Sequence, residues 1–157
     1  MEYSLPELDS LDRMILRELQ QDNISQVELA KRIALSPPAV HARIKRLEEM
    51  GILRRYVALV DREKLGYDLM CIVGVTLQRH QAADVNLFHQ AVQHMSEVME
   101  CFSVTGEYDY LLKVVARSRK DLERILLEKL TLMPGVARIT TSIVLSEVKN
   151  TTEIALE

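Results

Sequence analysis

The N-terminal third of the chain alternates apolar and polar positions with the period of an α-helix in three successive segments. The apolar positions are Leu11, Ile15, Leu16 and Leu19 in the first segment, Val27, Leu29, Ala30 and Ile33 in the second, and Val40, Ile44 and Leu47 in the third. Positions three and four residues apart lie on the same side of a helix, so each segment has one side to bury. The pattern predicts three short helices around a common core.

Signals for helix ends delimit the second and third segments. Ser25 begins a capping box with a glutamate three residues later, in which the two side chains pair backbone N–H groups at the helix start. After a tight turn, Ser36 is a second cap, followed by Pro37 at the first helical position. Gly51 then ends the third helix. Two capped helices joined by a tight turn predict a helix-turn-helix, which places its second helix in the DNA major groove.

The second half of the sequence alternates between the period of strands and the period of helices. Strands are expected at residues 71–78, 98–105, 108–116 and 136–148, and helices at 82–95 and 119–132. The order β-α-β-β-α-β is ferredoxin-like, a four-stranded antiparallel sheet with both helices on one face. We therefore predict an α+β chain. It has a winged helix-turn-helix at residues 1–60, a hinge at 61–67 and a ferredoxin-like domain at 68–157.

The sheet face without helices also needs a cover. Ile72, Tyr110, Leu112 and Val144 are expected to make this face too apolar to be left to water. A second copy of the chain is the simplest cover, and it would present two recognition helices to a two-fold DNA site. We expect a homodimer as the smallest assembly.

Charge is distributed unevenly along the chain. The formal net charge is −3, which is unusual for a DNA-binding protein. Residues 31–55, however, contain seven Lys or Arg and two acids, whereas residues 63–157 contain ten basic and thirteen acidic residues. The positive field is therefore confined to the predicted helix-turn-helix.

The helical period also selects candidate DNA contacts. Small residues on the side of the third helix opposite its apolar stripe allow a close approach to DNA, and the basic ones can reach phosphates and guanine edges. We expect Arg43, Lys45 and Arg46 to dominate affinity, and the extended stretch that begins at Arg54 to form a wing. The full set of candidates is Ser25, Gln26, Ser36, Pro38, Ala39, Ala42, Arg43, Lys45, Arg46 and Arg54. An ordinary helical hairpin with a solvated basic side is the alternative.

The sequence lacks the signals of a membrane protein, a secreted protein, a metal-binding protein and an enzyme. No apolar run reaches the roughly 20 residues of a membrane span, and no signal peptide is evident. Cys71 and Cys101 each lie in an apolar strand pattern, as small core residues of a cytoplasmic protein do. The histidines and cysteines lack the spacing of a metal site, and no catalytic triad or phosphate-binding glycine loop is present. We expect no metal, no cofactor and no enzymatic activity.

The sequence as a whole resembles the Lrp/AsnC family of transcription regulators. The likeness covers nearly the whole chain. In the first half, the motifs that resemble the family are Leu11-Asp12, Ile15-Leu16, Val27-Glu28-Leu29-Ala30, Leu35-Ser36-Pro37, Arg43-Ile44-Lys45-Arg46-Leu47-Glu48 and Gly51-Ile52. In the second half they are Val104 to Leu112, Pro134-Gly135-Val136 and Glu147-Val148-Lys149.

The resemblance implies a DNA-binding domain followed by a domain that senses a small effector, usually an amino acid, at a subunit interface. It also implies that dimers associate further, often into a ring of four dimers. The effector positions map onto Gly106, Glu107, Tyr108, Asp109, Ser142, Ile143 and Val144. Some relatives have a bulky aromatic residue where this chain has Ser142, so the effector's identity does not transfer.

Physical reasoning fits this assignment. A glycine at a strand turn lets backbone N–H groups approach a carboxylate, and Asp109 can accept from an ammonium group. Thr140 and Thr141, with Ser142, can complete a polar ring. The alternative for residues 106–110 is a β-turn in which Asp109 pairs with backbone only.

The leading function is a sequence-specific transcription regulator whose assembly or DNA affinity responds to an amino acid. An architectural protein that wraps double-stranded DNA with little sequence preference remains the alternative.

Overall fold

The computed structural model describes residues 7–21, 24–79 and 81–156 and contains two compact units. The first unit is formed by the described residues up to Ala58 together with those from Lys149 onward, and the second by Leu59–Val148. This division differs from the predicted one. The expected hinge at 61–67 lies inside the second unit, where residues 62–66 form a turn, and the final segment belongs to the first unit.

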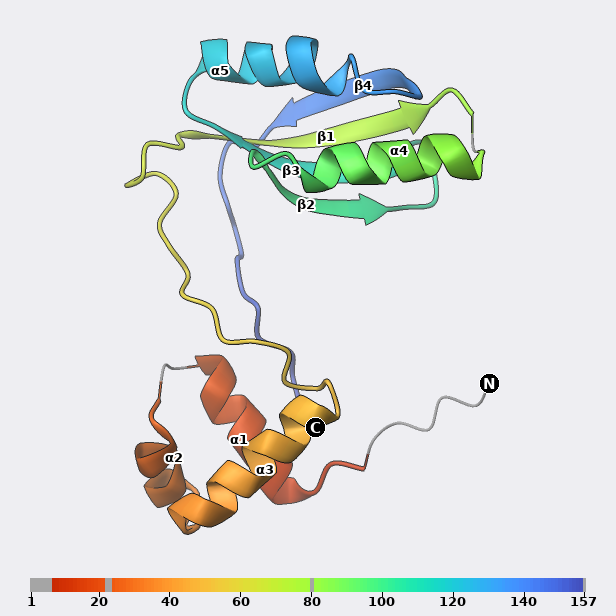
Figure 1. The fold of residues 1–157 in the computed structure, drawn as a ribbon. Coiled ribbons are helices and arrows are strands. Elements are labelled where there is room, and N and C mark those ends of the chain that lie inside the picture. The colour runs from red at the N-terminus through yellow and green to blue at the C-terminus, as the bar shows by residue number, and fades with distance from the viewer. Residues whose placement is uncertain (1–6, 22–23, 80, 157) are drawn as a thin grey trace. The chain divides into compact units, whose positions relative to one another are not determined.

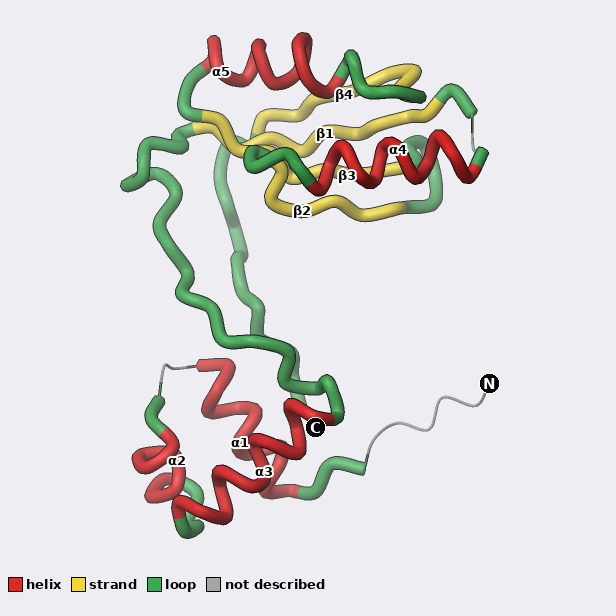
Figure 2. Tube along the Cα trace, viewed as in Figure 1, coloured by secondary structure: helices red, strands yellow, loops and turns green. Residues whose placement is uncertain are grey.

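The first unit contains the three predicted helices (Figure 2). They are α1 (Ser10–Gln21), α2 (Gln26–Arg32) and α3 (Pro37–Glu49). Ser25 Oγ accepts from the N–H of Glu28 at 3.2 Å, and Ser36 Oγ accepts from the N–H of Ala39 at 3.4 Å. Both serine caps are thus confirmed, whereas the Glu28 carboxylate of the predicted capping box pairs with Lys31 at 3.6 Å. The shared core is Ile15, Leu16, Leu29, Ala30, Ile33, Val40, Ile44 and Leu47, all buried.

The segment after α3 differs from the prediction of a wing. Gly51 adopts φ +70°, the left-handed conformation that ends a helix. The N–H groups of Ile52 and Leu53 then both bond to the carbonyl of Leu47. Residues 54–60 form neither helix nor strand, so the extended stretch that begins at Arg54 forms no β-hairpin wing.

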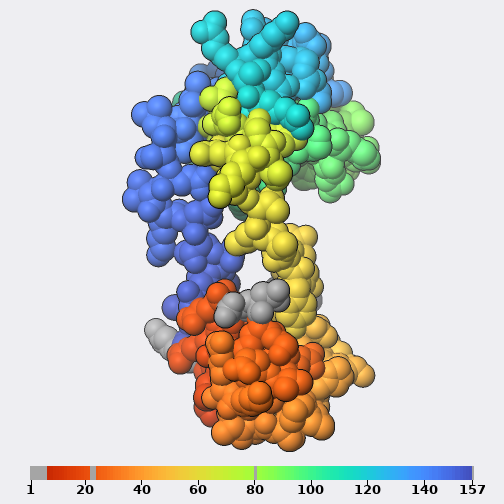
Figure 3. All heavy atoms as spheres, turned by 90° about the vertical axis from the view of Figure 1, so that its left-hand side faces the viewer, coloured from red at the N-terminus to blue at the C-terminus, as the bar shows by residue number. Residues whose placement is uncertain are grey.

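The final segment of the chain packs on α1 (Figure 1, Figure 3). The Gln20 side chain bonds twice to the backbone of Ile154, and the Arg17 guanidinium donates to the carbonyl of Leu156. Leu156 packs against the apolar core of the helices. The first unit is therefore built from two segments that are far apart in the sequence.

The second unit is the predicted ferredoxin-like fold. Its elements are β1 (Leu69–Leu77), α4 (Ala82–Gln93), β2 (Val98–Ser103), β3 (Tyr110–Ala116), α5 (Arg119–Arg124), the π-helical continuation η1 (Ile125–Leu130) and β4 (Val136–Ile143). The strands pair antiparallel in the order β2-β3-β1-β4, and both helices cover one face (Figure 1). The last strand ends at Ile143, five residues before the predicted end, although the N–H of Val144 still bonds to the carbonyl of Met70.

The main core of this unit lies between the sheet and its helices. Every second residue of β1 and β3 points into it, including Val73, Val75 and Leu112. The prediction that Tyr110 and Leu112 lie on the uncovered face is therefore wrong. The Tyr110 ring lies 4.6 Å from that of Phe88 in α4, and the hydroxyl oxygen lies 2.9 Å from Nε2 of His89.

The open face, meaning the sheet surface opposite the helices, is made by the alternate residues. Ile72, Leu111 and Phe102 share it through their register in β1, β3 and β2. Ile72 is 37% exposed and Phe102 is 54% exposed. An apolar open face, as the sequence predicted, is thus present with partly different residues.

Candidate DNA-binding surface and ligand site

The α3 helix has one buried side and one accessible side. Val40, Ile44 and Leu47 are buried, whereas Pro38 and Ala42 on the opposite side are exposed. Side chains this small leave the backbone of the first two turns open to close approach. The geometry of the predicted reading surface is therefore present.

The start of α2 lies next to this surface. Nδ1 of His41 lies 3.1 Å from Oε1 of Gln26, which links the first turn of α2 to α3. Ser25, Gln26 and Ser36 are exposed, and Ala39 is half-buried. These predicted contact residues are therefore at least partly accessible, and Gln26 lies next to α3. Sequence reasoning missed His41, although its place three residues beyond Pro38 puts it on the same side of the helix.

Arg43 and Arg46 have a different environment from the one predicted. Nη1 of Arg43 lies 2.7 Å from Oδ2 of Asp9 and 2.7 Å from Oδ1 of Asp12. Nη2 of Arg46 donates to Oδ2 of Asp12. Both guanidinium groups are therefore paired with the start of α1, within the unit itself. Sequence reasoning assigned both to DNA because Asp12 is more than thirty residues away along the chain.

The electrostatics of this cluster agree with its geometry. The pKa of Asp9 is lowered by the backbone N–H of Asp12, which donates to Oδ1 at 2.8 Å, and by the Arg43 guanidinium. Hydrogen bonds to Asp9 and Asp12 in turn raise the pKa of Arg43. The charged forms of Asp9 and Arg43 therefore stabilise each other.

The remaining basic candidates are more accessible. Lys45 pairs only loosely with Glu49, at 3.7 Å, and both side chains are two-thirds exposed. Exposed pairs of this kind contribute little and are readily exchanged. Arg54 and Arg55 are exposed in the extended segment after α3. Lys45, Arg54 and Arg55 are thus better placed for phosphate contacts than Arg43 and Arg46.

The predicted effector loop connects β2 to β3. Gly106 has φ +117°, a conformation that favours glycine. Oδ2 of Asp109 accepts from the N–H of Leu77 at 2.7 Å, and the backbone N–H of Asp109 donates to the carbonyl of Val75 at 3.0 Å. One carboxylate oxygen of Asp109 therefore fastens the loop to the end of β1, where the register with β4 shifts. Glu107 pairs with Arg138 of β4 at 3.6 Å.

Tyr108 lies across the open face above Gly74. A Cβ atom on Gly74 would lie 2.6 Å from Cδ1 of Tyr108, which is closer than real Cβ contacts come. Gly74 therefore makes room for the aromatic ring. Sequence reasoning missed Gly74, although a glycine inside a strand is itself a signal of close approach.

The predicted residues of β4 divide between the two faces of the sheet. Thr140 and Ser142 stand opposite Gly74 and Ile72, so they share the open face with Tyr108. Thr141 and Ile143 alternate with them and point to the helix side, which breaks up the predicted polar ring. The structure brings together Thr140, Ser142 and Tyr108 and separates Thr141 and Ile143 from them.

An unpaired polar atom lies beside this group. Oγ1 of Thr76 is buried and has no hydrogen-bond partner among the residues that the structure describes. Thr76 alternates with Val75 and Leu77, so it belongs to the open face, opposite Arg138. A buried hydroxyl without a partner is costly, so it marks a place where a ligand or water gains a hydrogen bond.

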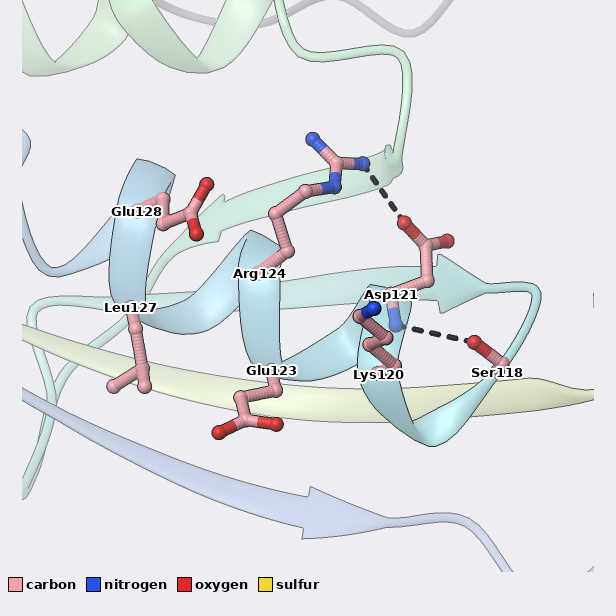
Figure 4. A pocket seen from close by; sticks show the side chains of 7 residues that line it. All are labelled: Ser118, Lys120, Asp121, Glu123, Arg124, Leu127 and Glu128. Carbon is pink, nitrogen blue, oxygen red and sulfur yellow. Dashed lines mark hydrogen bonds and ion pairs between the residues drawn. The ribbon is translucent and has the colours of Figure 1, made fainter.

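A shallow hollow elsewhere is lined by α5 and η1 (Figure 4). Two polar contacts lie within it: Arg124 pairs with Asp121 at 2.8 Å, and Ser118 Oγ accepts from the N–H of Asp121 at 3.1 Å. It contains none of the predicted effector residues. Over the described ranges, no three His, Cys, Asp or Glu side chains are placed to hold a metal ion. No helix in those ranges is long and apolar enough to cross a membrane.

Comparison with known proteins gives each unit a counterpart. Residues 8–54 match the family model for a winged helix-turn-helix DNA-binding domain, and residues 70–154 match that for the Lrp/AsnC ligand binding domain. The leucine-responsive regulatory protein of Escherichia coli K12 is 39% identical over 152 residues, covering 96% of this chain and 93% of that protein. The transcriptional regulator AzlB of Bacillus subtilis is 34% identical over 151 residues, 96% of each.

Solved structures of related proteins agree with these family matches. A transcriptional regulator from Neisseria meningitidis, solved as an L-Met complex, has a TM-score of 0.90 and 35% identity over 95% of this chain and 97% of that one. AsnC of E. coli has a TM-score of 0.84 and 30% identity over 94% and 98%. The relatives match this chain over nearly their whole length, and both domains have a family model. The capped helix pair points to the same family. The chain belongs to the Lrp/AsnC family of DNA-binding transcription regulators, with a helix-turn-helix domain and a ligand-binding domain.

Proposed function

We propose that the ligand is a free amino acid, bound on the open face beside Tyr108, and that its binding changes the affinity or assembly of the regulator on DNA. The observation that carries the proposal is the unpaired Thr76 hydroxyl next to the loop that holds Asp109. One oxygen of Asp109 is fixed by Leu77, so the carboxylate is already oriented before a ligand arrives. The N. meningitidis relative solved with L-Met supports an amino acid as the ligand class.

A thermal-shift screen of the protein against the twenty amino acids tests this proposal. A ligand that binds only the folded state raises the melting temperature with the logarithm of its concentration. Thr76→Val removes the unpaired hydroxyl and should reduce the shift. Thr141→Val, on the helix side of the sheet, is the matched control. Equal shifts in both variants, or no shift with any amino acid, would contradict the proposal.

On DNA, the first two turns of α3 enter the major groove through Pro38, Ala39 and Ala42, and Lys45 and Arg54 contact phosphates. The accessibility of this surface supports the assignment. Lys45→Ala should weaken binding to every DNA sequence. It should also lower the salt slope, meaning the steepness with which the logarithm of the affinity falls with the logarithm of the salt concentration, by about one. Lys120→Ala, in the other unit, is the control for an equal loss of charge. An unchanged slope for Lys45→Ala would show that another surface contacts DNA.

A second copy of the chain covers the open face. The support is apolar surface at Ile72 and Phe102, which a monomer would leave in water. Phe102→Asp should shift the protein to monomers in sedimentation at micromolar concentration. Leu127→Asp adds the same charge at an exposed site in η1 and should leave the assembly intact. Sedimentation of the unaltered protein as a monomer would refute the dimer and, with it, any larger ring.

A further inference from the structure

Asp12 has two structural roles at once. It lies at the third position of α1, and its side chain is completely buried, with 0% exposed. Oδ1 of Asp9 accepts from the N–H of Asp12 at 2.8 Å, while Oδ2 of Asp12 accepts from the N–H of Asp9 at 3.2 Å. This reciprocal pair is a capping box at the start of α1. The same Asp12 carboxylate also accepts from Arg43 and Arg46 of α3.

The two arginines are three residues apart, so they leave α3 on the same side of the helix. Arg43 is 27% exposed and Arg46 is 49% exposed, so both bridge from the buried carboxylate to the surface. Charged hydrogen bonds are directional, whereas the apolar contacts of Val40, Ile44 and Leu47 are not. The apolar stripe therefore holds α3 in place, and the two ion pairs restrict its rotation about its own axis.

That rotation determines which side chains face DNA. Successive residues point about 100° apart, so a modest turn of α3 would move Ala42 and Lys45 away from the groove. We propose that Asp12 is a positioning residue for DNA reading, which fixes the rotation of α3 through Arg43 and Arg46 without itself contacting DNA. This proposal deepens the proposed function of α3 as the helix that reads DNA, and it rests on that proposed function.

The cluster also limits non-specific binding. Two acids, Asp9 and Asp12, face two arginines, so the cluster has no net formal charge and the guanidinium groups are engaged. Loss of the Asp12 charge would release the Arg46 guanidinium toward phosphates, while Arg43 would keep its ion pair with Asp9. Affinity for any duplex would then become more salt-dependent, because each added phosphate contact releases further counterions. A role in stability alone predicts no such change in the folded protein.

The test compares two duplexes: one selected by the unaltered protein from a random library, and a scrambled duplex of the same composition. Binding is measured by fluorescence anisotropy over a series of salt concentrations. For Asp12→Asn, which keeps the shape and removes the charge, we expect the preference for the selected duplex to fall about tenfold or more. Its salt slope on the scrambled duplex should rise by about one. A folded variant that keeps the original preference and slope would overturn the proposal.

Matched variants separate the alternatives. Asp9→Asn removes the exposed acid and keeps both arginines on Asp12, so the preference should change little. Arg46→Gln retains the Asp12–Arg43 pair, so it keeps the proposal testable if Asp12→Asn does not fold. If Arg46 is a positioning residue, Arg46→Gln should reduce the preference for the selected duplex and leave the salt slope on the scrambled duplex unchanged. Equal weakening on both duplexes, with a slope lower by about one, would identify it as a phosphate contact and contradict the proposal.

Lys45→Ala in the same assay keeps the two proposals distinguishable. Loss of affinity on both duplexes supports α3 as the reading helix, whatever the result for Asp12. If Lys45→Ala loses no affinity, α3 is not the surface that contacts DNA, and Asp12 then has no reading helix to position.

Discussion

Gln20 of α1 and the backbone of Ile154 are joined by two hydrogen bonds. Oε1 of Gln20 accepts from the N–H of Ile154 at 2.7 Å, and Nε2 donates to the carbonyl of the same residue at 3.1 Å. A side-chain amide matches a peptide group in this way, so it orders an extended segment that has no strand beside it. The chain thus passes from the ligand-binding unit back into the DNA-binding unit, where residues after β4 contact α1.

Gln20→Ala should destabilise the DNA-binding unit by about 1 kcal/mol, since it removes two hydrogen bonds that are partly accessible to water. Thermal unfolding followed by circular dichroism, together with hydrogen exchange of the α1 amides, measures the effect. Gln21→Ala is the matched control, because Gln21 donates to the exposed Glu153 side chain, at 3.1 Å. Equal stability of Gln20→Ala and Gln21→Ala would show that the final segment does not stabilise α1.

Gly74→Ala should destabilise the ligand-binding unit by about 1–3 kcal/mol, because the new methyl group would meet the Tyr108 ring at 2.6 Å. Urea unfolding of the single variants and of the double variant Gly74→Ala with Tyr108→Ala checks the cause. In the double variant the ring is absent, so the added cost of the methyl group should nearly vanish. A cost that persists would show that strain in β1 itself, not the ring, requires glycine.

Features that depend on neighbouring residues could be predicted from the sequence. The caps at Ser25 and Ser36 and the end of α3 at Gly51 use atoms a few residues apart, so their signals are local. The strand order followed from the alternation of periods, because the ferredoxin-like arrangement is one of few solutions. The end of β4 was placed too late because residues 144–148 continue an apolar pattern without pairing as a strand.

Features that depend on distant partners could not be predicted in this way. A helical wheel places Arg43 and Arg46 away from the apolar stripe, but it says nothing about an acid in another helix. One signal was present: Asp12 precedes Ile15, Leu16 and Leu19 at helical spacing, so a charge lies on the side to be buried and needs a partner. The bond from Asp109 to Leu77 likewise joins residues 32 apart and has no local signature.

The ligand-binding unit should lose stability in acid through Glu97. Burial by itself raises the pKa of Glu97, but hydrogen bonding to Lys129 and the charges of Lys129 and Arg124 outweigh it, so the pKa lies below the ordinary value of 4.5. A lowered pKa in the folded state stabilises the protein above pH 4.5, and this contribution is lost as the pH falls through the folded value.

Glu97→Gln should therefore be less stable than the unaltered protein near neutral pH, and the difference should shrink as the pH falls below 4.5. Urea unfolding at a series of pH values measures both proteins. Glu123→Gln, an exposed change in α5, is the control and should show little pH-dependent difference. A difference that stays constant with pH would indicate that packing, not charge, explains the effect.

Asp109 allows its structural role and its proposed ligand contact to be separated. Asp109→Ala leaves the N–H of Leu77 without its acceptor and should cost about 1–3 kcal/mol. Asp109→Asn keeps a carbonyl oxygen for that N–H but removes the charge that an ammonium group needs. It should therefore unfold at nearly the temperature of the unaltered protein and lose most of the thermal shift given by the amino acid found in the screen. Glu107→Gln removes a neighbouring charge that pairs with Arg138 at the surface, so its shift should stay near the original. If Asp109→Asn keeps its full shift, Asp109 holds the loop and does not bind the ammonium group.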